Sequence, residues 1–432
     1  MQENDKKQST KNIKDFLWVN FLYFTQGLPF TFLRTTVVPA FLKSMGESNH
    51  VVGFTSLLGI PYTFKFLWSP FVDLFWKKRS WTLCLQALLL AVLVLMSFIV
   101  VMPNAKVFWW VAFGLCAFLS ATSDIAIDGF YLEALDEEKQ AAFAGVRTMA
   151  YRVAMILGSS IPLVIAERVN WFWAFMSCAV LYGICFLYNL FFLPRDTHLT
   201  LAPNNIEICD SLREEAKIQK YFQEYGRAFL TYLEQKKIIL IISFVIIYKL
   251  GDAMLFAMNT PFLLDLGITK EQLGWIGGTL GKIGSIAGSL AGGWWVSRIG
   301  LKKGLWQSAL FMNFTILVYG VLALAKMHLW EVAAIHFLEQ FAAGIGATAF
   351  VIFQMRTCSK EFKASHYAIS TSLIAFGPMI SGPIGGYLSE WLIHKDGLHL
   401  GYAYYFLFCF LASLPGLALI HFLPWEEERF KK

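Results

Sequence analysis

Ten ionisable side chains interrupt stretches of this sequence that are otherwise apolar enough to lie in a membrane. Each would cost about 2.5–3.5 kcal/mol at the centre of a lone helix in lipid, so they must face one another or water. Cations in such a place can bind carboxylate or phosphate groups, and carboxylates can exchange protons. The set comprises six cations and four anions: Arg34, Lys65, Arg147, Arg152, Lys249 and Lys282, with Asp124, Asp128, Asp252 and Glu339.

Asp124 and Asp128 are four residues apart, which places both on one face of a helix. Two carboxylates this close repel each other, so one of them can hold a proton near neutral pH. The pair is therefore the candidate for proton coupling. Arg147 and Arg152 lie at matching depths beyond the short turn at 136–140. This leaves open a fixed brace between two helices, in which Asp128 pairs with Arg147 and Asp124 with Arg152.

The cations predict a wet cavity that binds an anion. Six positive charges against four negative ones leave an excess of two, which favours a substrate with carboxylate or phosphate groups. Lys249 and Asp252 are three residues apart, so they also fit a pair that only neutralises itself. The candidate substrate-binding residues are Arg34, Lys65, Arg152, Lys249, Asp252, Lys282 and Glu339.

The elements that must position these residues are transmembrane helices. Hydrophobic residues make up 57% of the 432 residues and charged residues only 15%, which is more apolar surface than one soluble core can hide. Runs such as 80–105 and 169–194 contain no charged residue and can span about 30 Å of hydrocarbon. We expect an all-α integral membrane protein with twelve spans, at 16–43, 51–75, 81–102, 107–135, 141–166, 171–194, 238–265, 273–298, 303–325, 330–356, 363–392 and 400–423.

The connecting loops differ in basic residues from one side of the membrane to the other. One set of loops carries a single Lys or Arg apiece, whereas the other set includes the clusters at 77–79 and 302–303. Basic loops stay on the cytoplasmic side of a membrane. We therefore expect both termini to be cytoplasmic.

The two halves of the chain resemble each other. At an offset of 223 residues, Glu138, Thr148 and Ile161 fall on the same residue types. Two parallel six-helix repeats around a central cavity are typical of the major facilitator fold. We expect an N-terminal bundle at 1–194, a cytoplasmic linker with an interfacial helix at 195–236, and a C-terminal bundle at 237–432.

Motifs of other protein classes are incomplete here. The glycine-rich stretch at 344–349 has no preceding strand, and the Gly281-Lys282 pair lacks the rest of a nucleotide-binding loop. We interpret the glycines at 277, 281, 284, 288 and 292 as a seam along which one helix packs closely on another. The seven cysteines have no metal or disulfide spacing. We expect no catalytic residue, no metal, no cofactor and no nucleic-acid partner, and an ion gradient rather than ATP as the energy source.

Three motifs resemble those of the AmpG muropeptide permease family, a group of major facilitators that is similar to acetyl-coenzyme A transporters. They are residues 23–29 (YFTQGLP), 64–70 (FKFLWSP) followed by Asp73, and 120–128 (SATSDIAID) with Tyr151 and Arg152. The resemblance implies proton-driven import of anhydromuropeptides across a bacterial inner membrane. It places Lys65, Asp73, Asp124, Asp128 and Arg152 on family motifs.

The chain departs from the family pattern in three ways. Ser123 stands where the family usually has Gln, the basic turn before Trp81 is reduced to residues 77–80, and twelve spans replace the fourteen of some members. The changed residue beside the paired aspartates bears on which sugar or peptide is recognised. The fold expectation does not depend on any of the three.

We expect a monomeric, proton-coupled symporter in the lipid bilayer that binds an anionic sugar-peptide and works by alternating access. Asp73 with Lys77, Lys78 and Arg79 would form a cytoplasmic gate by pairing across the closing halves. Three alternatives stay open: transport of acetyl-coenzyme A or a siderophore-like anion, a membrane-embedded enzyme, and a sensor that binds its ligand without moving it.

Overall fold

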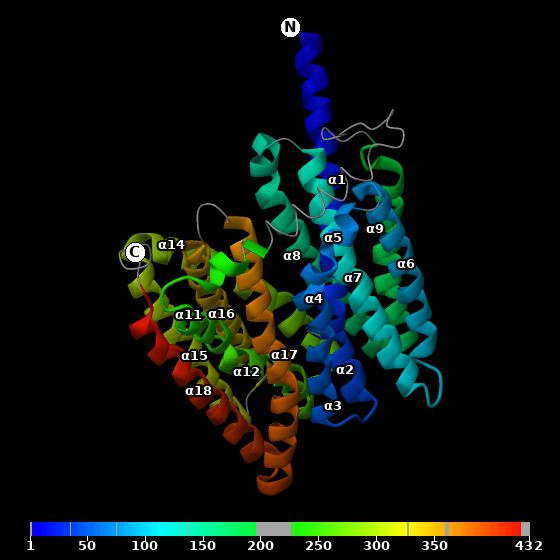
Figure 1. Cartoon of the computed structure of the whole chain (residues 1–432). Coiled ribbons are helices and arrows are strands. Elements are labelled where there is room, and N and C mark those ends of the chain that lie inside the picture. Colours follow the sequence, from blue (N-terminus) through cyan, green and yellow to red (C-terminus); the bar gives the residue numbers. More distant parts are fainter. Residues whose placement is uncertain are drawn as a thin grey trace.

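The computed structural model describes residues 2–34, 36–74, 76–135, 137–195, 226–227, 229–325, 328–358 and 363–424. All regular elements within these ranges are helices. Figure 1 shows two helical bundles side by side, an N-terminal half in blue to green and a C-terminal half in green to red. The end at which the N terminus lies is called the upper end below, and the opposite end the lower end.

The N-terminal half corresponds to the first six predicted spans. Its elements are α1 (Gln2–Arg34), α2 (Val37–Ser44), α3 (Asn49–Gly53), η1 (Phe54–Gly59), α4 (Ile60–Phe64), η2 (Lys65–Leu67), α5 (Ser69–Leu74), α6 (Lys78–Ile99), α7 (Lys106–Ala134), α8 (Glu137–Arg168) and α9 (Trp171–Phe192).

The C-terminal half corresponds to the last six predicted spans. Its elements are α11 (Ile238–Ile247), α12 (Leu250–Asp265), α13 (Lys270–Leu273), η3 (Gly274–Leu280), α14 (Gly281–Ile299), α15 (Leu301–Leu324), α16 (Leu329–Thr357), α17 (Lys363–Asp396) and α18 (Leu398–Phe422). Most of the linker at 195–236, with its predicted interfacial helix, lies outside the described residues.

Eight helical segments in the described ranges are long and apolar enough to cross a membrane. The predicted span at 51–75 is not one continuous helix, because it consists of the short pieces α3, η1, α4, η2 and α5. Pro61 and Pro70 each occupy the first turn of a new piece, where the missing N–H donor costs nothing. The resulting break places Lys65 in the short 3₁₀ turn η2 rather than in a regular helix.

The predicted glycine seam is confirmed between α14 and α16. A Cβ on Gly284 would lie 2.9 Å from the carbonyl oxygen of Phe337, and one on Gly288 would lie 2.0 Å from that of Phe341. Only glycine lets two helix backbones approach this closely. The seam holds Lys282 of α14 near the middle of α16.

The two halves meet at the lower end. A Cβ on Gly53 would lie 2.2 Å from the carbonyl oxygen of Gly382, so α3 and α17 touch backbone to backbone. Ion pairs cross the same end of the molecule: Lys43–Asp265 at 2.8 Å, Lys270–Glu167 at 3.2 Å, His50–Glu390 at 2.7 Å, and Arg168–Glu271.

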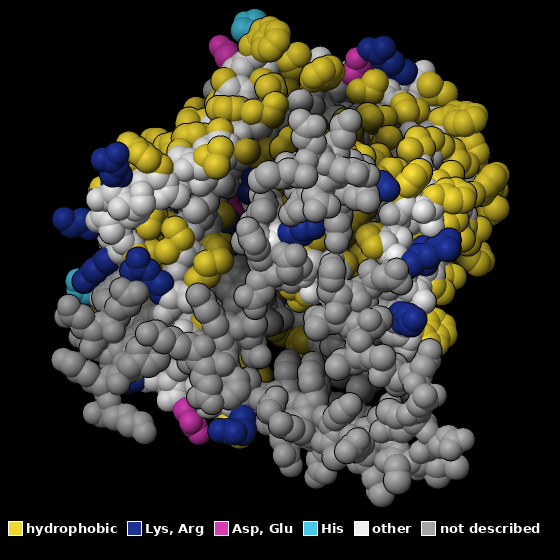
Figure 2. Space-filling view, turned by 90° about the horizontal axis from the view of Figure 1, so that it is seen from above, with side chains coloured by type: hydrophobic (Ala, Val, Ile, Leu, Met, Phe, Trp, Pro, Cys, Tyr) yellow, Lys and Arg dark blue, Asp and Glu magenta, His cyan; other side chains and the backbone are white. Residues whose placement is uncertain are grey.

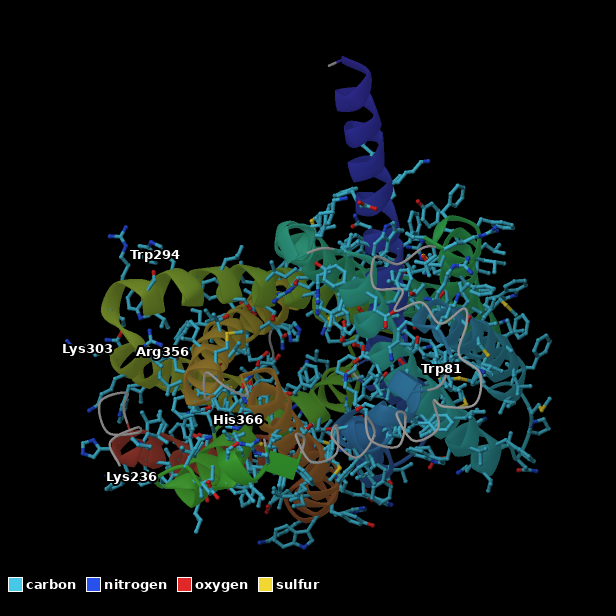
Figure 3. The ribbon with its side chains drawn as sticks, turned by 45° about the horizontal axis from the view of Figure 1, so that its top comes forward. Trp81, Lys236, Trp294, Lys303, Arg356 and His366 are labelled. Atoms are coloured by element: carbon cyan, nitrogen blue, oxygen red, sulfur yellow. The ribbon has the colours of Figure 1, made fainter. Side chains whose placement is uncertain are left out.

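The upper end carries the basic loops. Figure 2 looks onto this end and shows Lys and Arg side chains spread over it, with hydrophobic side chains on the flank. In Figure 3, Lys303 and Arg356 project from the C-terminal half on this side, and Trp81 lies on the N-terminal half. The four ion pairs given above join described residues of the two halves at the lower end, and they close that end of the molecule.

Candidate functional site

A cavity of about 770 Å³ lies between the two halves. Its wall is formed by α1, η1, α7 and α8 on one side and by α12, α14, α16 and α17 on the other. Six of the ionisable residues that the sequence singled out contribute to this wall: Asp124, Arg147, Arg152, Lys249, Asp252 and Lys282. Buried charges from both bundles thus converge on one chamber, as expected from the cost of leaving them in lipid.

Lys65, Asp128 and Glu339 lie one contact behind the wall. Each of these three forms a hydrogen bond or ion pair with a residue that lines the cavity. A charge in such a position can interact electrostatically with a bound ligand without contacting it directly. The structure therefore brings nine of the ten ionisable residues to one site, and the side chain of the tenth, Arg34, lies outside the described residues.

Asp124 joins three elements of the N-terminal half. One of its carboxylate oxygens is ion-paired with Lys65, and the other accepts a hydrogen bond from the side-chain amide of Gln26. The brace between Asp124 and Arg152, one of the alternatives that the sequence left open, does not form among the described residues. The break of the second span turns Lys65 toward Asp124, so the aspartate is neutralised from η2 instead of from α8.

Asp128 pairs with Arg147, which is one half of the brace that their matched depths on either side of the turn left open. The carboxylate lies 3.6 Å from the guanidinium and accepts a hydrogen bond from the Tyr23 hydroxyl at 2.9 Å. The guanidinium of Arg147 also stacks over the rings of Tyr23 and Tyr131, at 4.7 and 5.2 Å from their centroids. These contacts fix α1, α7 and α8 around one ion pair.

In the C-terminal half, Lys249 and Asp252 form the ion pair that their spacing allowed, with 3.3 Å between the ammonium and the carboxylate. Glu339 is only 2% exposed and accepts a hydrogen bond from Gln340 at 2.8 Å. The Lys282 ammonium lies 5.5 Å from the centroid of the Phe256 ring.

Two cations on the wall have no carboxylate partner within the described part of the chain. Arg152 projects from α8 of one half and Lys282 from α14 of the other. The other described cations of the set are paired: Lys65 with Asp124, Arg147 with Asp128, and Lys249 with Asp252. Two unpaired cations across one chamber are an arrangement that binds an anion with more than one charged group.

Comparison with known families identifies the scaffold. The family model described as Major Facilitator Superfamily matches residues 19–248 and 240–432. The chain belongs to the major facilitator superfamily. This agrees with the predicted fold of two pseudo-symmetric six-helix bundles.

The chain is also similar in sequence to known transporters, and in fold to solved transporter structures. The chain is 29% identical over 407 residues to the anhydromuropeptide permease of Escherichia coli K12, covering 92% of this chain and 77% of the permease. It is 27% identical to a Rickettsia conorii protein assigned as transporter AmpG 4, covering 96% of this chain and 98% of that protein. The crystal structure of a D-xylose-proton symporter superposes with a TM-score of 0.72 at 10% identity, covering 95% and 98% of the two chains. That of a peptide transporter bound to sulfate gives 0.68 at 12% identity, covering 94% of each.

Several residues in the wall of this major facilitator were not predicted as site residues. Tyr23, Gln26, Tyr151, Phe256 and Gln340 line the cavity. Tyr23 and Gln26 belong to the first of the motifs that resemble the AmpG family, so that motif was the available signal. Phe256 lies on an apolar helix of the C-terminal half, where no local pattern distinguishes it from packing residues. Gln340 directly follows Glu339 on α16, so its place beside that acid was the available signal.

The predicted gate lies at the upper end of the same half. The side chain of Asp73 is outside the described residues. Lys77 is exposed, Lys78 donates a hydrogen bond to the carbonyl oxygen of Val72 at 2.8 Å, and Arg79 donates to that of Leu193 at 3.3 Å. These contacts stay within the N-terminal half, and the gating role remains a prediction for another conformation.

Proposed function

We propose that this major facilitator is a secondary active transporter that imports an anhydromuropeptide across a bacterial inner membrane, coupled to protons. The observation that carries the proposal is the pair of unpaired cations, Arg152 and Lys282, facing one cavity from opposite halves. The printed name of the Escherichia coli relative supports this class of cargo. The peptide part of such a molecule ends in carboxylates, which these cations suit.

Binding can drive alternating access because the two cations belong to different halves. The planar guanidinium of Arg152 suits a bidentate contact with a carboxylate, and the Lys282 ammonium suits a second anionic group. A cargo held by both draws α8 and α14 together above the cavity. Binding energy is then available to close the upper end and to open the lower one.

Aromatic and hydroxyl groups complete the chamber. Phe30, Tyr151 and Phe256 offer flat apolar faces to the rings of a sugar, and Ser285 and Ser289 offer hydroxyl groups to its polar edges. This mixture of apolar surface with a few placed polar groups is typical of a small-molecule site. It supports a cargo with both sugar and peptide parts.

Proton coupling fits the ion pairs of the N-terminal half. Protonation of Asp124 would release Lys65, and protonation of Asp128 would release Arg147, since each cation pairs with that carboxylate. The freed cations would then add to the positive lining of the cavity. Asp124 or Asp128 is therefore the proposed site at which a proton enters the cycle.

The proposed orientation places the upper end in the cytoplasm. The basic clusters at 77–79 and 302–303 lie at this end, as does Arg356. The described conformation would then be inward-facing, with the lower end closed toward the outside. Asp73 with Lys77, Lys78 and Arg79 would meet the C-terminal half when the upper end closes.

Uptake of labelled anhydromuropeptide into proteoliposomes, with and without an inward pH gradient, tests the proposal. Accumulation should require the gradient and should be lost in the double variant Asp124→Asn with Asp128→Asn. Uptake that ignores the gradient, or that survives the double substitution, would remove the proton role. Competition by a coenzyme A ester, with none by the muropeptide, would assign a different cargo.

A further inference from the structure

Glu339 is the one buried acid of the described site that has no ion-pair partner. Its side chain is 2% exposed, and its hydrogen-bond partner is the neutral amide of Gln340. Asp124, Asp128 and Asp252 each lie beside a cation. A buried carboxylate without an ion-pair partner is costly, so either a bound proton or an approaching cation stabilises it.

Charged and titratable groups of three neighbouring helices lie within electrostatic range of Glu339. Lys249 and Asp252 belong to the start of α12, Lys282 to α14, and Tyr319 to α15. Lys249 is already neutralised by Asp252. On α16 itself, His336 lies one turn away and is hydrogen-bonded to Tyr319 at 2.6 Å. Lys282 is therefore the cation left to respond to Glu339.

The backbone beside Lys282 departs from regular α-helix. The π-helical segment η3 (Gly274–Leu280) ends immediately before α14, and π-helical turns are frequent at functional sites. A small cavity lies against this point, lined by Gly277, Lys282 and His336 among others. Gln340 contacts Glu339 and also lines the large cavity, so it connects the acid to the substrate chamber.

We propose that Glu339 is a second proton site, which controls whether Lys282 is available to the substrate. When Glu339 is protonated, Lys282 is free to bind an anionic group of the cargo. When the proton leaves for the solvent of the cavity, the Glu339 carboxylate attracts Lys282 and competes with the cargo for it. Proton and substrate are then coupled in the C-terminal half. This inference rests on the proposed function in taking the cargo to be an anion.

Binding of an anhydromuropeptide to the purified full-length protein, measured calorimetrically between pH 5.5 and 8, tests this coupling. For the wild type, the affinity should rise as the pH falls, by at most about tenfold per pH unit for one linked proton. Glu339→Gln, which mimics the protonated acid, should bind tightly with this pH dependence removed or clearly reduced. An unchanged wild-type slope in Glu339→Gln would overturn the proposal.

Two further variants control for structural effects. Glu331→Gln makes the same change on the same helix, at its exposed start, where glutamine can keep the capping hydrogen bond to the backbone of His328. It should keep the wild-type slope. Glu339→Asp retains a carboxyl group and should keep a slope with a shifted midpoint. A flat profile in Glu339→Asp would contradict the proposal even if Glu339→Gln did not fold.

An infrared titration separates this inference from the choice of cargo. The C=O stretch of a protonated carboxyl should be present in the wild type in lipid without any substrate. The part of this band that Glu339 contributes should be missing in Glu339→Gln, so that the difference between the two spectra assigns it, while any contribution of Asp124 or Asp128 persists in both. If the wild type binds no anhydromuropeptide but shows this band, the proposed cargo fails and the proton site stands. Identical infrared titrations of wild type and Glu339→Gln would reject the proton site whatever the cargo.

Discussion

The Lys43 ammonium lies 2.8 Å from the Asp265 carboxylate and joins the end of α2 to the end of α12 across the two halves. Tyr402 donates a hydrogen bond to the same carboxylate at 2.7 Å, and Asn49 links Lys43 to Tyr402 through contacts of 2.8 and 3.0 Å. One half thus supplies Lys43 and Asn49, and the other supplies Asp265 and Tyr402. The network therefore holds the two halves together at the lower end.

Loss of the Asp265 charge should therefore open the lower end. A hydrogen bond to a charged group contributes about 1.5–3 kcal/mol to the stability of the conformation that contains it. Asp265→Asn should remove part of this stabilisation from the closed conformation and leave the open conformation unaffected. Distances between spin labels placed on the two halves at the lower end should shift toward an open population. Asp396→Asn, a change at the end of α17 on the same side, should leave the distances unchanged. Equal distributions in Asp265→Asn and wild type would show that the network does not hold the closure.

A second pair at the lower end predicts how the closure responds to acid. The hydrogen bond from Arg168 lowers the pKa of the Glu271 carboxyl below its ordinary value of 4.5. Because the pKa of the folded state is depressed, the contribution of this pair is complete above about pH 4.5 and is lost as the pH falls through the lowered pKa. Both side chains are solvent-exposed in part, so the effect is small.

The same lower-end distances, followed from pH 8 to pH 4, check this expectation. Between pH 6 and pH 8, Glu271→Gln and wild type should respond to pH alike, because the pair does not titrate there. A response in this range that disappears in Glu271→Gln would place a proton-sensitive switch at the lower end. In that case a pH effect on transport would have to be assigned to Glu271 rather than to the acids of the cavity.

Arg152→Gln should weaken substrate binding without disturbing an ion pair. A charge-assisted hydrogen bond contributes about 1.5–3 kcal/mol, which corresponds to a rise in Kd of about 10–100-fold. Arg152→Lys keeps the charge but loses the bidentate geometry, so its Kd should lie between that of the wild type and that of Arg152→Gln. Arg298→Gln, which changes an arginine that contacts Trp294 outside the cavity, serves as the control. Wild-type affinity in Arg152→Gln would exclude the residue from the binding site.

The seam between α14 and α16 predicts a steric effect on stability. Gly288→Ala places a methyl group 2.0 Å from the Phe341 carbonyl oxygen, so the two backbones must separate. Overpacking of this kind costs about 1–3 kcal/mol. The midpoint of thermal unfolding in detergent should fall. Gly293→Ala, whose nearest neighbour would be the Thr348 methyl carbon at 3.8 Å, should leave the midpoint near that of the wild type.

The sequence by itself determined the class of protein and which ionisable residues belong to its site. Charges are too costly in lipid to face it, so ten ionisable residues in apolar segments required a shared polar chamber, and the structure places nine of them in or beside one. Helical periodicity placed Asp124 and Asp128 on one face, and a short turn put Arg147 opposite Asp128. These relations are local, because helix geometry and a few turn residues fix them.

Tertiary structure alone decided which charges are left unpaired. Lys65 reaches Asp124 because the second span breaks at its prolines, and no sequence spacing links residues that are 59 positions apart. Because Lys65 pairs with Asp124, Arg152 is left without that carboxylate. The packing of α14 on α16 brings Lys282 near Glu339, and no spacing in the sequence specifies that these two residues are neighbours. Helical periodicity sets which residues share a face, but the rotation of one helix against its neighbours is set by side-chain packing along the whole bundle.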